Sequence, residues 1–151
     1  MQQEDLAGFI GFAMFREGKE HFDWKIEVET EGVLLPDELV PFVAQWNVSP
    51  KLANSGMPLN RRYKPEVLSW HNVNGNSFFK FPVASLKDVA EVDAIVAEIR
   101  IPPNKVFLMP VADTREKLAA LSPSVIEWCK ERSYSFSTRL HVAIWDKVTG
   151  V

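Results

Sequence analysis

Cysteine is almost absent from this sequence, and that scarcity limits the chemistry the chain can perform. The chain has 151 residues and a single cysteine, Cys129. One cysteine makes no internal disulfide and no cysteine-rich metal site, so we expect a cytoplasmic protein that holds no metal through cysteines. Cys129 falls on the apolar stripe of an expected helix, and we interpret it as a small buried residue.

Other features that the sequence lacks exclude further classes of function. The formal net charge is −3 and no basic patch is present, so we expect no direct binding to nucleic acid. No apolar run approaches the roughly 20 residues that span a bilayer, and the start of the chain has no positive segment typical of a secretory signal. There is no glycine-rich phosphate loop, no Ser-His-Asp signature and no metal-ligand spacing of His, Cys and Asp. Motifs alone therefore define no catalytic or metal-binding residues.

Five segments are predicted to be β-strands. In the first, at 24–32, apolar Trp24, Ile26 and Val28 alternate with charged side chains, which is typical of a strand with two different faces. The others are expected at 44–48, 77–83, 104–111 and 139–146.

Helices are expected between most of these strands. Helical periodicity is found at 4–18, 85–100 and 113–134. Ser85 can cap the second of these, and Pro123 predicts a kink or break in the third. Residues 54–76 contain Gly, Pro and Asn and are interpreted mostly as loop, with a short helix at 65–70. Alternating strands and helices favour a single α/β domain with mostly parallel strands and right-handed crossovers.

Polar residues collect where the predicted strands end. The first strand ends in Glu29-Thr30 and the second in Ser49-Pro50-Lys51. In parallel α/β proteins, ligands bind beyond the carboxyl ends of the strands, so these residues predict a polar rim suited to a polar ligand.

Each of these residues also has an ordinary structural interpretation. Lys51 can be a solvated loop lysine, and Lys80 can simply follow strand alternation between two phenylalanines. The Glu27 and Glu29 pair can be a solvated or salt-bridged face of the first strand. His141 on the expected last strand can be a hydrogen-bonded structural histidine. The residues alone leave these alternatives open.

Several segments, taken in order, resemble one enzyme family. The segments "VETEG", "SPKL", "FFKFPV", "VFLMPV" and "STRLHVAIWDKVTGV" are similar to segments of 7-carboxy-7-deazaguanine synthases. These are radical S-adenosylmethionine enzymes of queuosine and 7-deazaguanine biosynthesis, and the resemblance runs from about Leu6 to Val151. It implies a reduced α/β barrel that converts 6-carboxytetrahydropterin, with loss of ammonia, to 7-carboxy-7-deazaguanine. The family uses S-adenosylmethionine, a [4Fe-4S] cluster and Mg²⁺.

The resemblance covers only the C-terminal half of such an enzyme. The family's Cys-x-x-x-Cys-x-x-Cys cluster loop and its Gly-Gly-Glu-Pro motif are absent, and "MQQEDL" is similar to the residues that follow the second motif. The resemblance therefore implies half of a partial (β/α) barrel, inactive without its cluster-bearing half. We expect that half as a separate chain, or a homo-oligomer. A non-catalytic interaction module derived from the same barrel is the alternative.

The resemblance also implies cofactor-binding residues. Ser49, Pro50 and Lys51 match the family's Ser-Pro-Lys, which binds S-adenosylmethionine. Met109 and Pro110 match the strand end near the adenosyl group. The family continues this strand end with Glu-Gly, whereas this chain continues with Val-Ala.

Substrate-binding residues follow from the resemblance as well. Val151 matches the terminal residue whose free carboxylate reaches the pterin substrate in the family. Glu29 and Thr30 match a Glu-Thr-Asn-Gly segment, in which Glu31 replaces the Asn.

Overall fold

The strands form one parallel sheet whose spatial order follows the sequence. The computed structural model of the chain describes residues 25–36, 39–74 and 76–148. Its strands are Ile26–Thr30 (β1), Val43–Val48 (β2), Ser77–Val83 (β3), Val106–Pro110 (β4) and Ser135–Phe136 (β5). They lie in the order β1-β2-β3-β4-β5, and each neighbouring pair is parallel. The predicted α/β class with parallel strands is confirmed, whereas the helix expected at 4–18 lies outside the described residues.

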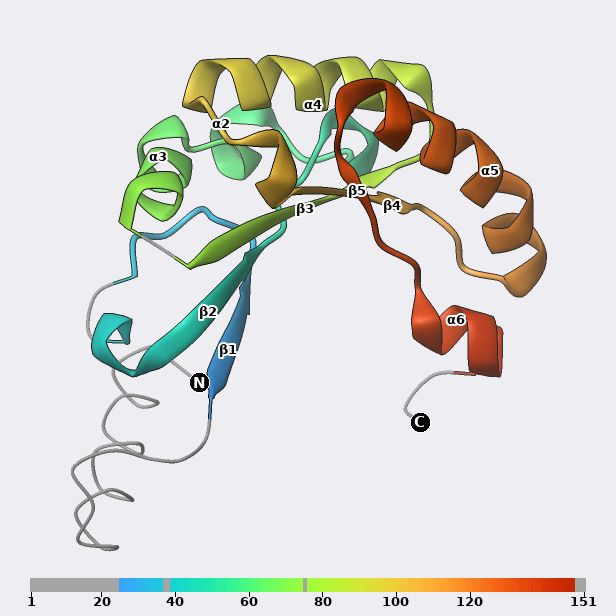
Figure 1. The fold of residues 1–151 in the computed structure, drawn as a ribbon, viewed down its shortest axis with the longest axis horizontal. Coiled ribbons are helices and arrows are strands. Elements are labelled where there is room, and N and C mark those ends of the chain that lie inside the picture. Colours follow the sequence, from blue (N-terminus) through green and yellow to red (C-terminus); the bar gives the residue numbers. More distant parts are fainter. Residues whose placement is uncertain (1–24, 37–38, 75, 149–151) are drawn as a thin grey trace, which may run out of the picture.

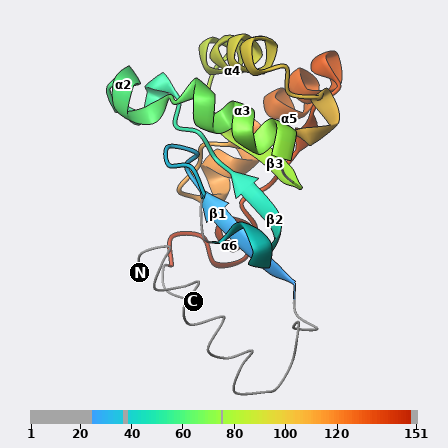
Figure 2. The ribbon, with the colours of Figure 1, turned by 90° about the vertical axis from the view of Figure 1, so that its left-hand side faces the viewer.

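Helices cover one face of this sheet. The described helices are Leu59–Arg62 (α2), Pro65–Asn74 (α3), Leu86–Ile99 (α4), Arg115–Arg132 (α5) and Leu140–Trp145 (α6). Figures 1 and 2 show α3, α4 and α5 together on one side of the sheet, with α6 toward the other side. Parallel strands need crossover connections, and same-handed crossovers between successive neighbours place their helices on the same face. Among the described helices, none combines the length and apolar composition needed to cross a bilayer.

The core lies between the sheet and these helices. Along β3, buried Ser77, Phe79, Phe81 and Val83 alternate with partly exposed residues. Phe79 and Phe81 belong to the same buried apolar cluster as residues of α4 and α5. The side chains of the alternate β3 positions, such as Lys80, point to the opposite face. The sheet therefore has an apolar face under the helices and a second face, which we call the open face.

The start of α4 is fixed by a capping box. The Ser85 hydroxyl accepts a hydrogen bond from the Asp88 backbone N–H at 3.4 Å. The Asp88 carboxylate accepts from the backbone N–H groups of Ala84 at 2.8 Å and Ser85 at 3.1 Å. The predicted cap at Ser85 is confirmed, and it holds the β3–α4 turn at the carboxyl edge of the sheet.

Of the kink or break predicted at Pro123, the break is wrong, because α5 is one helix from Arg115 to Arg132 with Pro123 inside it, and the kink stays a prediction. The proline lacks the N–H that would bond to the carbonyl four residues earlier. Leu118 on one side of Pro123 and Val125 and Cys129 on the other are all buried. Their burial holds both halves of α5 in place and outweighs the free-energy cost of the hydrogen bond that is missing at Pro123.

The predicted last strand at 139–146 is also wrong, because residues 140–145 form α6. Val142 is buried against Ala112 and Leu118, whereas Leu140 and Ile144 are exposed. A short apolar run does not distinguish a strand from one helical turn. The interpretation of His141 as a hydrogen-bonded histidine of that strand is wrong too, since His141 is exposed on α6.

The segment at 54–76 is more helical than predicted. It contains α2 and a ten-residue α3 that continues well past the short helix expected at 65–70. Val67, Leu68 and His71 are buried along one side of α3. Tertiary burial therefore overrides the loop-like composition of this segment.

Gly32 stands where the chain leaves β1, and a side chain there has no room. Its φ is +69°, and a Cβ would lie 2.7 Å from Leu68 Cδ2 and 2.8 Å from Val48 Cγ1. Gly56 has a similar φ of +73°, but a Cβ there would meet no atom of the described residues within 4 Å.

Replacing Gly32 with alanine is therefore expected to cost more stability than replacing Gly56. We expect G56A to lower the free energy of unfolding by about 1 kcal/mol through its left-handed backbone. We expect G32A to lower it by about 2 kcal/mol, because overpacking adds to the same backbone cost. Urea unfolding of both variants measures the difference. Equal losses would show that Leu68 and Val48 move aside without cost.

Candidate ligand site at the carboxyl edge of the sheet

A cavity of about 410 Å³ lies at the carboxyl ends of the strands. We call it the rim cavity, and its lining residues come from β1, β3, β4 and the segments that follow β1, β2, β4 and β5. They are Glu29, Thr30, Glu31, Ser49, Lys51, Lys80, Pro82, Met109, Val111 and Arg139. Parallel strands end at the same edge of a sheet, which is why residues so far apart in the sequence meet here.

Most of the site residues expected from the sequence meet in this cavity. Glu29, Thr30, Ser49, Lys51 and Met109 all line it. Pro50 and Pro110 are buried beside them and are not among the lining residues. Val151 lies outside the residues that the structure describes. The roles of all eight residues in binding a cofactor or substrate stay predictions.

The segment from Ser49 to Lys51 is tied to the neighbouring strands. The backbone N–H of Ser49 donates to the Thr30 carbonyl at 2.7 Å, and the Ser49 hydroxyl donates to the Lys80 carbonyl at 3.0 Å. The Lys51 ammonium lies 3.2 Å from the Glu31 carboxylate. The Ser49 proton is therefore committed to the protein, while its oxygen can still accept a hydrogen bond from a ligand.

A buried arginine supports this segment from behind. Arg62 donates to the Lys51 carbonyl at 3.1 Å and to the Met57 carbonyl at 3.2 Å, and it pairs with the Glu91 carboxylate. Glu91 in turn accepts from the backbone N–H of Ala53 at 2.9 Å. The pair holds the loop after β2 in one conformation, a role that the sequence did not reveal because Arg61 and Arg62 look alike in it.

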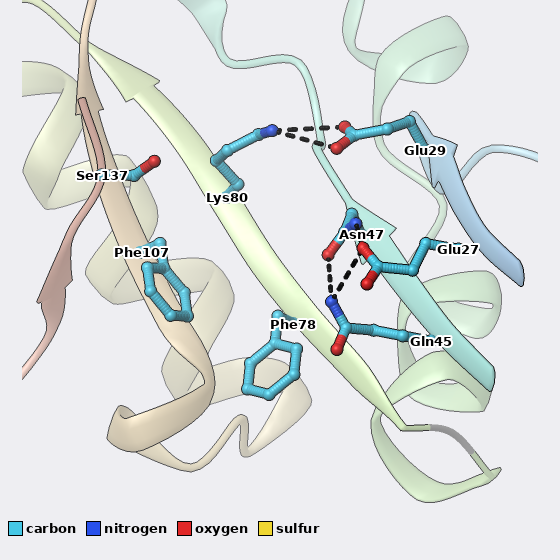
Figure 3. Close-up of a pocket in the computed structure, with 8 residues that line it drawn as sticks. All are labelled: Glu27, Glu29, Gln45, Asn47, Phe78, Lys80, Phe107 and Ser137. Carbon is cyan, nitrogen blue, oxygen red and sulfur yellow. Dashed lines mark hydrogen bonds and ion pairs between the residues drawn. The ribbon is translucent and has the colours of Figure 1, made fainter. Parts of the chain in front are cut away.

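A second cavity of about 280 Å³ lies on the open face of the sheet (Figure 3). It shares Glu29 and Lys80 with the rim cavity, and the Lys80 ammonium lies 3.2 and 3.3 Å from the two Glu29 oxygens. Asn47 donates to the Glu27 carboxylate at 3.1 Å. The interpretation of Glu29 as part of a salt-bridged face is therefore confirmed. The wall of this cavity that β1 and β2 form is therefore polar.

The other wall of the open-face cavity is aromatic. The rings of Phe78 and Phe107 lie edge to face, with centroids 5.8 Å apart and an interplanar angle of 81°. Both rings are only partly buried. The open face therefore offers apolar rings beside carboxylates, which suits a further layer of protein or a flat polar ligand.

The residues present do not fit an iron–sulfur cluster. Three thiolates hold such a cluster in the family, and the whole chain has one cysteine. Cys129 is buried, its thiol donates to the Ser135 carbonyl at 3.4 Å, and burial raises the pKa of that thiol. In the described ranges, no group of three or more His, Cys, Asp and Glu residues is placed to hold a metal ion. This chain therefore supplies neither cluster ligands nor, in its described part, a built Mg²⁺ site.

Comparison with known proteins confirms the resemblance read from the sequence. No protein-family model matches the chain. A 7-carboxy-7-deazaguanine synthase of Pyrobaculum aerophilum is 33% identical over 128 residues, which are 83% of this chain and 54% of that protein. The chain is a homologue of 7-carboxy-7-deazaguanine synthases.

Two further relatives carry the same name. The 7-carboxy-7-deazaguanine synthase of Hyperthermus butylicus is 26% identical over 137 residues, 85% of this chain and 56% of its own length. That of Halobacterium salinarum is 29% identical over 140 residues, 79% of this chain and 53% of its own length. The chain thus spans about half the length of the curated 7-carboxy-7-deazaguanine synthases it matches.

Proposed function

We propose that this chain is the C-terminal half of a 7-carboxy-7-deazaguanine synthase, in which a second polypeptide completes a partial (β/α) barrel of the radical S-adenosylmethionine type. The observation that carries the proposal is the rim cavity. Its walls combine Ser49 and Lys51, which follow β2, with Met109 at the end of β4, and all three match the family's cofactor segments. The reaction would be the conversion of 6-carboxytetrahydropterin to 7-carboxy-7-deazaguanine in the cytoplasm.

The chain's own residues would bind and orient. Ser49 and Lys51 would meet the polar groups of S-adenosylmethionine, Met109 would pack against its adenosyl group, and buried Pro50 and Pro110 would keep these strand ends rigid. Glu29, Thr30 and Val151 would hold the pterin. When bound beside a [4Fe-4S] cluster, S-adenosylmethionine supplies the radical chemistry of the family. The ligands of that cluster, and those of Mg²⁺, would lie on the other polypeptide.

The unpaired surfaces of the described chain support a partner. The outer edges of β1 and β5 have no neighbouring strand in the described sheet. Unpaired strand edges are templates for further pairing. On α6 and just beyond it, Leu140, Ile144, Trp145 and Val148 are exposed large apolar residues. A cluster-bearing half would cover such surfaces, and self-association into a homo-oligomer is the other way to cover them.

Reconstitution tests the proposed function. The purified chain, supplied with iron, sulfide, reductant and S-adenosylmethionine, is expected to form no 5′-deoxyadenosine above background. Adding the part of the Pyrobaculum aerophilum synthase that this chain does not match is expected to start its formation.

Variants of two lysines provide the matched control. Lys51→Met is expected to reduce the 5′-deoxyadenosine formed by the mixture, and Lys87→Met, at an exposed position on α4, is expected to leave it unchanged. Formation of 5′-deoxyadenosine by the chain alone would contradict the proposal that a second polypeptide supplies the cluster. A mixture that binds the added part but forms no product would instead favour the non-catalytic interaction module.

A further inference from the structure

Arg139 lines the rim cavity, and its positive charge has no ion-pair partner among the described residues. It follows β5, occupies the position before α6, and its side chain lines the cavity. Its Nε is buried and has no hydrogen-bond partner among the residues that the structure describes. A buried donor without an acceptor costs about 1–3 kcal/mol, and more when it is charged. Such a group is expected to have a partner that the described residues do not provide.

The other charges of the cavity cancel one another. Lys51 pairs with Glu31 at 3.2 Å, and Lys80 pairs with Glu29 at 3.2 Å. No ion pair among the described residues involves Arg139. The lining of the rim cavity therefore carries one uncompensated positive charge, at its α6 end.

A carboxylate is the group that matches this arginine. A guanidinium presents a planar fork of N–H donors that pairs with both oxygens of a carboxylate, and the pair is stronger where water is excluded. Because the lysines of the cavity already have carboxylate partners, an incoming carboxylate would meet Arg139 without displacing an existing pair.

We propose that Arg139 binds the carboxylate of the molecule that occupies the rim cavity, and that it makes the cavity select carboxylate-bearing ligands over analogues without that group. The choice of ligands rests on the proposed function, since S-adenosylmethionine and 6-carboxytetrahydropterin both carry a carboxylate. Arg139 is then a specificity-determining residue, in addition to the residues that the family resemblance implies.

Matched pairs of ligands test the proposal in solution. The probes are S-adenosylmethionine against 5′-methylthioadenosine, 6-carboxypterin against pterin, and nicotinate against nicotinamide as a pair unrelated to the family. The readouts are dissociation constants and the Nε–Hε NMR resonance of Arg139 in the wild-type chain, assigned by its absence from Arg139→Lys. We expect Arg139→Gln to weaken a carboxylate probe about tenfold or more, and its partner probe less than twofold. Arg61→Gln, at an exposed arginine of α2, is the control and is expected to change neither.

Each outcome decides between the two proposals. If Arg139→Gln selectively loses affinity for S-adenosylmethionine, or for 6-carboxypterin, the inference is supported, and the probe affected tells which carboxylate Arg139 binds. Selective loss with nicotinate alone supports the inference and removes the support for the proposed function. The inference is overturned if Arg139→Gln loses the same affinity for both members of a pair. It is also overturned if no carboxylate probe shifts the Nε–Hε resonance of Arg139. If adenosyl or pterin probes bind without that selectivity, the proposed function stands and Arg139 has only a structural role.

Discussion

Replacing Phe79 with alanine is expected to lower the free energy of unfolding by about 3–5 kcal/mol, which is a large part of the stability of an ordinary domain. Phe79 lies in the central strand β3, is fully buried, and belongs to the apolar cluster between the sheet and the helices. Its removal leaves a cavity that rigid neighbours cannot fill. Urea unfolding followed by circular dichroism measures the loss.

The neighbouring phenylalanine is the matched control. Phe78 lies on the open face of the same strand, is only partly buried, and has an edge-to-face contact with Phe107. Phe78→Ala is expected to cost about 1 kcal/mol, the usual worth of an aromatic pair at such a site. If both substitutions cost the same, the open face is covered in solution, and unfolding of the wild-type chain should then depend on protein concentration.

Mildly acidic pH is expected to destabilise the domain through His71. His71 is fully buried on α3, with ring centroids 5.3 Å from Trp46 and 5.1 Å from Trp70. Both ring nitrogens lack hydrogen-bond partners within the described part of the chain. Burial in this apolar site disfavours the imidazolium and lowers the pKa of His71 to about 4.

The sign of the pH effect follows from that shift. Between pH 6.5 and about 4, the unfolded chain binds a proton at His71 that the folded chain does not. Stability is therefore complete above pH 6.5 and falls as the pH falls, by about 1.4 kcal/mol per unit and about 3 kcal/mol in total. Urea unfolding at pH 7.5, 6.5, 5.5 and 4.5 measures the slope.

Two variants assign this slope to His71. His71→Phe keeps a flat ring between the two tryptophans and is expected to remove most of the slope. The same change deletes two unsatisfied buried nitrogens, so it is expected to stabilise the chain at pH 5. His141→Asn, at an exposed position on α6, is expected to leave the slope unchanged. A slope that persists in His71→Phe would assign acid sensitivity to other groups.

The elements that the sequence predicted well are those with long, regular patterns. The β3 strand and the α4 helix carry strict periods of two and 3.6 residues and an unmistakable Ser85 cap. The C-terminal helix α6 was missed because six apolar-rich residues satisfy either period. The two-residue β5 was missed because its pairing with β4 depends on tertiary position rather than on a local pattern.

The candidate site was predictable in its position but not in its electrostatics. Strand ends locate the rim cavity, since parallel strands must end together. Which cation lacks an ion-pair partner cannot be read from the sequence, because the charges of Lys51 and Lys80 are balanced by carboxylates that only folding brings near. Arg139 was placed merely at the start of a strand, and its unsatisfied Nε becomes visible only in three dimensions.

The strand order also has a consequence for how the chain is made. Because β1 to β5 lie side by side in the order of synthesis, each new strand can join the edge of the preceding one as soon as it leaves the ribosome. In the described sheet, no strand waits for a distant segment to be inserted between two earlier ones, so the entropy lost on closing each loop stays small. Shortening the chain from its end would remove one strand at a time from the growing edge and leave the earlier pairings in register.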